Sequence, residues 1–166
     1  LYHTPASVGA IAWASIVGVL MILHLAKIVR DRGRSPAKSR SPRAIALNTR
    51  DSMALGVVWG AMPALYFSPS DAHEQTIIAV VMVGMMCGGA FMLSTVPKGA
   101  IAFVGPIAAG CLIGLLQDPS RGNLFVAALL AVYVATLAWA VRWAFQEFIG
   151  RLLSEALVRQ QAAQLE

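Results

Sequence analysis

Charged side chains are what this sequence has least of. Asp, Glu, Lys and Arg together make up 13% of the 166 residues, whereas apolar residues make up 58% and the mean hydropathy is +0.69. A soluble globular domain carries about a quarter charged residues and roughly half apolar ones. The scarcity of charge argues against a soluble protein, and we expect an integral membrane protein that contacts the lipid bilayer.

Cysteines and the motifs of common enzyme classes are equally scarce. The two cysteines, Cys87 and Cys111, fall inside apolar runs, where a thiol behaves as a small apolar side chain and indicates no disulfide framework. The sequence has no G-x-S-x-G, P-loop or H-E-x-x-H motif and no pair of carboxylates in apolar surroundings. We therefore expect no catalytic residue in this chain.

Long apolar runs are what the sequence does contain. A helix needs about 20 residues to cross the hydrocarbon layer, and five segments reach or approach this length, the second being the shortest. They predict an all-α integral membrane fold, with a bundle of five transmembrane helices within residues 1–145. The predicted spans are residues 8–29, 53–67, 76–96, 99–116 and 124–143.

Residues 146–166 continue the last span without a strong helix breaker. They are rich in Leu, Ala, Gln, Glu and Arg, which favour helix, and contain a single glycine, Gly150. We expect one helix that leaves the bilayer and serves as a cytoplasmic signalling helix.

Two apolar seams compete on that helix. The first is interrupted by Arg159, and neither gives a clean heptad register, so the pattern predicts a weak parallel coiled coil that switches between registers. A homodimer through the C-terminal helix follows from this interpretation. The first seam contains Ile149, Leu152, Ala156 and Ala163, and the second contains Leu153 and Leu157.

The basic residues predict the orientation. If the spans alternate in direction, all 13 Lys and Arg residues except Arg121 lie on one side, and cytoplasmic loops carry the excess of such residues. The C-terminal helix is then cytoplasmic, while the N-terminus and the turns at 68–75 and 117–123 are external. Membrane topology accounts for the net charge of +5, so we expect no nucleic-acid partner. Because an external N-terminus with five spans is uncommon, we expect a sixth, upstream helix in the full-length protein.

Glycines at four-residue spacing predict helix packing sites. Gly84 and Gly88 lie in the third span, and Gly110 and Gly114 lie in the fourth. Small residues at this spacing let two helices approach closely. Packing within the bundle and a dimerising or shifting helix interface are the two interpretations.

Helix breakers inside two spans predict a small ligand pocket. Pro63 follows Trp59-Gly60, and Gly105-Pro106 interrupts the fourth span. We expect kinks that shape an external-facing pocket for an apolar or amphipathic ligand, with Trp59, Pro63 and Tyr133 as lining residues. Broken helices also form substrate sites in transporters, so a small transporter or channel subunit is the alternative interpretation.

His24 is the candidate cofactor-binding residue. An ionisable side chain within a predicted span is a functional hypothesis, and a nearby methionine, Met21, suits haem or copper. The other two histidines are predicted at the opposite face, so pairing with a headgroup or a neighbouring helix is the competing interpretation. For the methionines of the third span, core filling is preferred over soft-metal binding; they are Met82, Met85 and Met86.

The segment at residues 30–50 is strongly basic and contains two Arg-Ser-Pro triplets. Basic residues near a bilayer surface attract anionic lipid, each by roughly 1 kcal/mol. Anionic lipid is therefore a predicted partner, and a topology signal alone is the alternative interpretation.

Several stretches resemble the N-terminal membrane input regions of bacterial signalling proteins. They are residues 50–67 (RDSMALGVVWGAMPALYF), 83–90 (VGMMCGGA) and 93–97 (LSTVP), followed by the long exit helix. Such regions precede GGDEF or EAL domains of cyclic-di-GMP signalling, or histidine kinases of two-component systems. The resemblance implies a dimeric sensor in the bacterial inner membrane, with a signalling enzyme beyond residue 166. A haem- or copper-binding membrane module is a further alternative.

Overall fold

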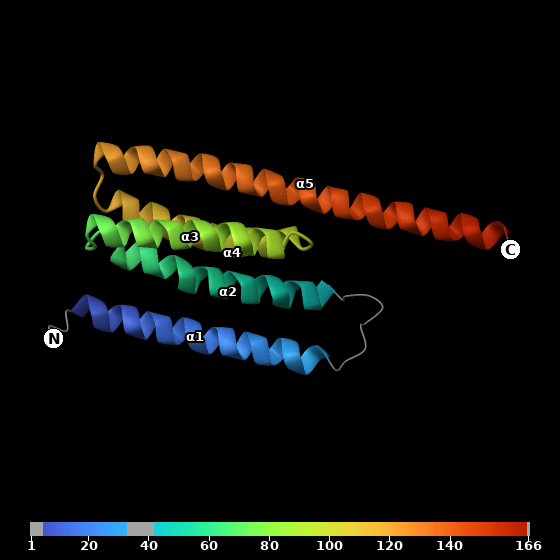
Figure 1. The fold of residues 1–166 in the computed structure, drawn as a ribbon, viewed down its shortest axis with the longest axis horizontal. Helices are drawn as coiled ribbons and strands as arrows, with labels where there is room; N and C mark the ends of the chain where they lie inside the picture. The colour runs from blue at the N-terminus through green and yellow to red at the C-terminus, as the bar shows by residue number, and fades with distance from the viewer. Residues whose placement is uncertain (1–4, 33–41, 166) are drawn as a thin grey trace.

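The computed structural model describes residues 5–32 and 42–165, which form five α-helices and no strand (Figure 1). The all-α prediction is confirmed for these residues, and each predicted span corresponds to a separate helix. Two predicted ends were wrong: the third span was set to end at residue 96, but its helix ends at Met92, and the second span ends one residue beyond its helix. The helices are α1 (Pro5–Arg32), α2 (Pro42–Tyr66), α3 (Ala72–Met92), α4 (Pro97–Leu116) and α5 (Arg121–Leu165).

Three of these helices are long and apolar enough to cross a membrane. They are α3, α4 and the Arg121–Glu155 part of α5. The apolar run of α1 within the described residues, Ile11–Leu23, is shorter. The second helix is longer than the predicted span 53–67, and its added residues include Arg50 and Asp51, which lower its hydropathy. Membrane crossing by α1 and α2 stays a prediction.

Local signals explain where α3, α4 and α5 begin. Asp71 caps α3, its carboxylate accepting a hydrogen bond of 2.8 Å from the Glu74 backbone N–H. Pro97 occupies the first turn of α4, where its missing N–H costs nothing. Ser120 precedes α5, and its hydroxyl accepts from the Asn123 backbone N–H at 3.2 Å. Each of these three helix starts is therefore marked by a residue at or just before the first turn.

Helix α4 lies at the centre of the bundle. It contacts α2, α3 and α5, whereas α1 contacts only α2 within the described part of the chain. Figure 1 shows α1, α3 and α5 running in one direction and α2 and α4 in the other. The start of α1, the α2–α3 turn and the α4–α5 turn therefore share one end, and α5 extends well beyond the other helices at the opposite end.

The core lies between α3, α4 and α5, with partly buried residues of α2 packed against it. Met82 and Met86 are 1% and 0% exposed and contribute two of its largest side chains. The unbranched methionine side chain adapts to irregular gaps between helices. This placement agrees with the core-filling interpretation of the methionines.

Helices α2 and α4 touch through backbone atoms. A Cβ built on Gly60 would overlap the carbonyl oxygen of Pro106, and a Cβ built on Gly110 would overlap the carbonyl oxygen of Gly60. Only a residue without a side chain fits at either position. The approach also places Cα–H groups against carbonyl oxygens, the geometry of weak Cα–H···O contacts at helix interfaces.

The same contact repeats one turn away in each direction. Gly56 faces the carbonyl oxygen of Phe103, and Gly114 faces that of Pro63, each leaving no room for a Cβ. All four glycines are buried. We call Gly56, Gly60, Gly110 and Gly114 the glycine seam, and it fixes the distance between α2 and α4.

Gly84 and Gly88 lie in a different environment. Both are exposed on α3, and a Cβ built on either would meet nothing within 4 Å. They are therefore not packed against another helix in the described part of the chain. Contact of this face with a second molecule stays a prediction.

The glycine seam generates a test of stability. We expect Gly110→Ala to destabilise the fold by about 1–3 kcal/mol, because the new methyl group forces the two backbones apart. Gly88→Ala is the matched control: it adds the same methyl group on an open face and favours helix by up to about 1 kcal/mol. Thermal unfolding of the purified protein in detergent, followed by circular dichroism, measures both. Equal midpoints for the two variants would contradict the seam.

Candidate functional site

A pair of tryptophans joins α1 to the rest of the bundle. The rings of Trp13 on α1 and Trp59 on α2 meet edge to face, with centroids 5.1 Å apart and an interplanar angle of 82°. The Trp13 indole N–H also donates a hydrogen bond of 2.9 Å to the Val58 carbonyl. Such aromatic pairs contribute about 0.5–1.5 kcal/mol beyond buried area. Among the described residues α1 contacts only α2, and there this pair is the main polar and aromatic link between the two helices.

The two indoles differ in how their N–H groups are satisfied. The Trp59 Nε1 atom is buried and has no acceptor among the described residues. Four residues on, Pro63 has no N–H, so the Trp59 carbonyl lacks the usual i+4 donor. A buried donor without a partner costs about 1–3 kcal/mol. Two polar groups of Trp59 therefore lack their usual partners: the indole N–H and the backbone carbonyl.

Pro63 and Tyr133, the other predicted pocket residues, lie in separate contacts. Pro63 is fully buried in the interface with α4, where Gly114 packs on its carbonyl. The Tyr133 hydroxyl on α5 donates to the Val83 carbonyl of α3 at 3.1 Å. Trp59 and Pro63 therefore face α1 and α4, whereas Tyr133 bonds to α3. The predicted pocket with these three residues as its lining stays a prediction.

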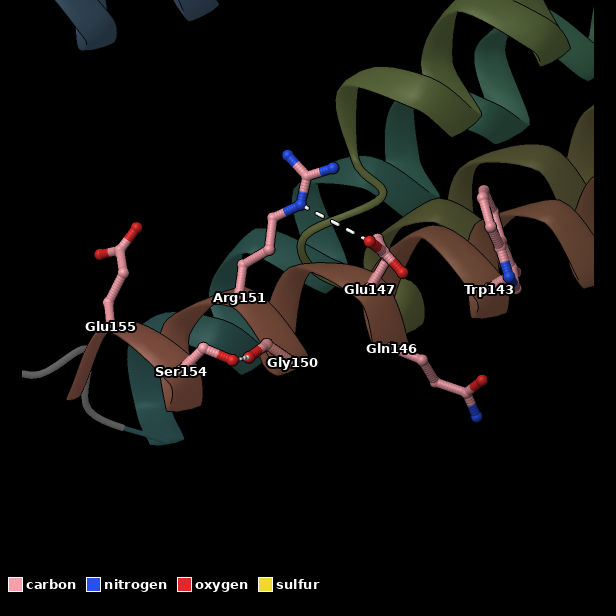
Figure 2. Close-up of a pocket in the computed structure, with 7 residues that line it drawn as sticks. All are labelled: Trp143, Gln146, Glu147, Gly150, Arg151, Ser154 and Glu155. Carbon is pink, nitrogen blue, oxygen red and sulfur yellow. Dashed lines mark hydrogen bonds and ion pairs between the residues drawn. The ribbon is translucent and has the colours of Figure 1, made fainter. Parts of the chain in front are cut away.

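An open, shallow recess lies along the part of α5 that extends from the bundle, and all of its lining residues belong to that one helix. Figure 2 shows its seven lining residues, all from α5, with the Glu147–Arg151 ion pair at 3.7 Å and the Ser154 hydroxyl donating to the Gly150 carbonyl at 3.0 Å. The ion pair is exposed, and such pairs contribute a few tenths of a kcal/mol. The remaining lining residues are Trp143, Gln146 and Glu155. This face of α5 is therefore polar.

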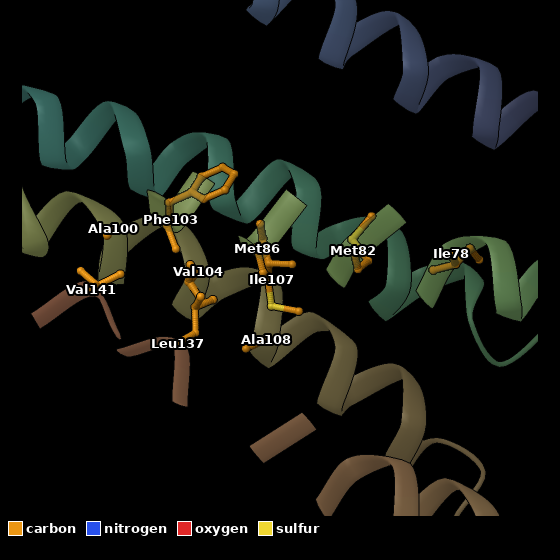
Figure 3. Close-up of a cluster of buried hydrophobic side chains, with 11 residues drawn as sticks. Ile78, Met82, Met86, Ala100, Phe103, Val104, Ile107, Ala108, Leu137 and Val141 are labelled. Carbon is orange, nitrogen blue, oxygen red and sulfur yellow. The ribbon is translucent and has the colours of Figure 1, made fainter. Parts of the chain in front are cut away.

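A smaller cavity of about 70 Å³ lies between α3, α4 and α5. Ala100, Val104, Leu137 and Val141, which are drawn in Figure 3, form part of its wall. Every lining side chain is apolar, and neither this cavity nor the recess is lined by Trp59, Pro63 or Tyr133. Ile101 and Gly105 in its lining are exposed, so this apolar space is open to the outer surface of α4.

The cofactor hypothesis for His24 lies outside the described side chains. The backbone of His24 belongs to α1, but its side chain is not among those that the structure describes. No group of three or more His, Cys, Asp or Glu residues suited to a metal ion occurs in the described part of the chain. Haem or copper ligation by His24 stays a prediction, as does lipid binding by residues 30–50, of which 33–41 are outside the described residues.

The tryptophan pair generates a test with an internal control. Trp13→Phe keeps an aromatic ring but removes the donor to Val58, so we expect α1 to detach more readily, at a cost of about 0.5–1.5 kcal/mol. Trp59→Phe removes a donor that has no acceptor, so we expect a smaller loss of stability. Hydrogen–deuterium exchange of α1, together with thermal unfolding, measures both variants. A larger effect of Trp59→Phe on α1 exchange would contradict this assignment.

Comparison with protein-family models, with curated proteins and with solved structures found no match. The resemblance to membrane input regions therefore remains a prediction from the sequence pattern. A functional proposal has to be argued from the helices, their contacts and their cavities.

Proposed function

We propose that this chain is a membrane-embedded sensory input domain that relays a signal through α5 to a cytoplasmic output. The observation that carries the proposal is the continuity of α5, a single helix of 45 residues from Arg121 to Leu165. Its first part is apolar enough to span a membrane, and its last part continues past Gly150 without interruption. A continuous helix transmits displacement along its axis, because its backbone hydrogen bonds link every turn to the next.

The exposed apolar surface supports membrane embedding. Large apolar side chains cover the outer faces of α3 and α5, including Val80 at 67%, Val132 at 64% and Trp139 at 68% exposure. Soluble monomers rarely expose continuous apolar areas of this extent. Lipid tails cover such a surface at no cost, and the basic residues favour a cytoplasmic location for the extended end of α5. That the membrane is the bacterial inner membrane is a proposal that follows from the resemblance to bacterial input regions.

The contacts of α5 support its role as the output element. Leu137 and Val141 of α5 are buried in the core, and Tyr133 bonds to α3. The glycine seam makes α2 and α4 one closely packed pair, whereas α5 contributes the side chains of Leu137, Val141 and Tyr133 to the contacts described above. A stimulus that alters packing near α3 and α4 would therefore shift α5 more readily than it would separate α2 from α4.

The extended part of α5 supports a homodimer. Its polar face lines the recess, whereas Leu152, Leu153 and Leu157 are 47%, 61% and 61% exposed. These leucines belong to the two competing seams of the sequence. Pairing with a second copy would cover them, and a change of seam would rotate the helices that lead to an output such as a diguanylate cyclase, a cyclic-di-GMP phosphodiesterase or a histidine kinase.

The transporter alternative has less support. Substrate sites of secondary transporters are formed by helices that unwind near the bilayer midplane. Here α2 is helical through Pro63 and α4 is helical through Pro106. We therefore prefer the sensor proposal.

Reporter fusions test the proposed orientation. An alkaline phosphatase that is active only outside the cytosol should be active when fused after Ser70 and inactive when fused after Glu166, because the basic residues hold the second site inside. A fluorescent protein that folds only in the cytosol should give the reverse pattern. Phosphatase activity at Glu166 would contradict the proposal.

Disulfide cross-linking tests the dimer through α5. In a Cys87→Ala, Cys111→Ala background, single cysteines at Leu152 and Leu153 should cross-link two copies in native membranes, since each is an exposed apolar residue of one of the two seams. Ser154→Cys, on the face that lines the recess, is the matched control and should cross-link poorly. Equal yields at all three positions, or none at any, would contradict the proposed dimer.

A further inference from the structure

Two basic residues on adjacent helices lie at the same level of the bundle. Lys98 is in the first turn of α4, and Arg142 is on α5, which packs against α4. Ala100 of α4 and Val141 of α5 line one apolar space, and each is within two residues of one of these cations. Lys98 and Arg142 therefore share a level, at the end of the bundle from which α5 extends (Figure 1).

The two basic residues also lie on the same side of the contact between α4 and α5. Ile101 of α4 and Ala138 of α5 line the same apolar space. Lys98 precedes Ile101 by three positions and Arg142 follows Ala138 by four, and residues at these spacings share a helix face. Both cations are exposed. They therefore flank the end of the α4–α5 contact from opposite helices.

Neither cation forms an ion pair within the described part of the chain. The ion pair on α5 joins Arg151 to Glu147, further along the helix. Asp51, an acidic residue of α2, has an interaction partner of its own. Lys98 and Arg142 therefore present two positive charges that are available to an anion.

The position of the pair matches the headgroup layer of a bilayer. At about 1.5 Å per residue, the stretch of α5 from Arg121 to Arg142 is roughly 31 Å long, close to the hydrocarbon thickness of about 30 Å. Trp139 and Trp143, which flank Arg142, are 68% and 59% exposed, and tryptophan is enriched at membrane–water interfaces. Both observations put Arg142 at the boundary between hydrocarbon and headgroups.

We infer that Lys98 and Arg142 bind the phosphate group of one anionic phospholipid. Charge complementarity selects an anion, and the depth of the pair selects a lipid headgroup over a phosphate in solution. The ammonium and guanidinium groups donate charge-assisted hydrogen bonds to phosphate oxygens. One headgroup held by both residues links α4 to α5 and opposes their separation. The site rests on the proposed membrane embedding, and its control of the relay rests on the proposed function.

Lipid titrations of the full chain in a neutral detergent, followed by native mass spectrometry, test the site. Phosphatidylglycerol and phosphatidylcholine with the same acyl chains are compared, and we expect one phosphatidylglycerol molecule to bind preferentially. A basic residue near an anionic surface contributes about 1 kcal/mol, a factor of about five in affinity. Lys98→Gln and Arg142→Gln should each lower phosphatidylglycerol affinity about fivefold and leave phosphatidylcholine affinity unchanged. Lys98→Arg and Arg142→Lys keep the charge and should keep the preference.

Arg151→Gln is the matched control, because it removes the same charge from the same helix. Arg151 is paired with Glu147 and lies about 13 Å beyond Arg142 along α5, at about 1.5 Å per residue. We therefore expect Arg151→Gln to leave phosphatidylglycerol affinity unchanged, with circular dichroism verifying the fold of every variant. Equal losses in Arg151→Gln and Arg142→Gln would overturn the inference, since they report net charge alone. Unchanged lipid preference in Lys98→Gln and Arg142→Gln would overturn it as well.

Competition with a soluble phosphate identifies the source of the anion. We expect glycerol phosphate in excess to leave phosphatidylglycerol bound, because it lacks the acyl chains that hold a lipid at this depth. Displacement of the lipid by glycerol phosphate would overturn the assignment to a phospholipid. The titration requires neither a fixed orientation nor an output domain, so its failure leaves the orientation and dimer tests intact, and the reverse also holds.

Discussion

The backbone contact between α2 and α4 is the constraint on which the rest of the structure depends. At the glycine seam, carbonyl oxygens of one helix occupy the space that a Cβ of the other would need. Rigid close packing of this kind is short-ranged and lost if the helices separate by even a fraction of an ångström. Because α3 lies between them in sequence, their pairing also fixes where α3 and its two turns run. Helix α4 then presents its other faces to α3 and α5.

The bundle thus combines a stiff part with adjustable parts. The α2–α4 pair is held by backbone contacts, and α1 is attached to it by the Trp13–Trp59 pair and one indole hydrogen bond. On the other side, Leu137 and Val141 of α5 pack against α3 and α4, next to an apolar space that is open to the surface. The proposed relay requires this difference in packing, because α5 has to move relative to the α2–α4 pair.

Much of the helical layout could be predicted from the sequence, because apolar runs and their breaks report it directly. The pairing of α2 with α4 could have been suspected, since Gly56-x-x-x-Gly60 and Gly110-x-x-x-Gly114 share one spacing, but Gly56 was not singled out. The sequence around Gly110 does not distinguish it from Gly84. Gly110 packs against the backbone of α2 and Gly84 packs against no helix, so the difference depends on the neighbouring helix. Trp13 was missed for the same reason, as its partner Val58 is 45 positions away. The cavity at Gly105 depends on the sizes of side chains from three helices, which no single stretch reveals.

The parallel arrangement of α2 and α4 has a consequence for how the chain is made. In the proposed bilayer, α2 carries Arg50 and Asp51 and is not among the helices apolar enough to cross on their own. Its partner α4 is synthesised later, after α3 has run in the opposite direction. If α2 crosses the membrane, the backbone contacts that hold it there form only after α4 has been translated, because the facing glycines and carbonyl groups belong to α4.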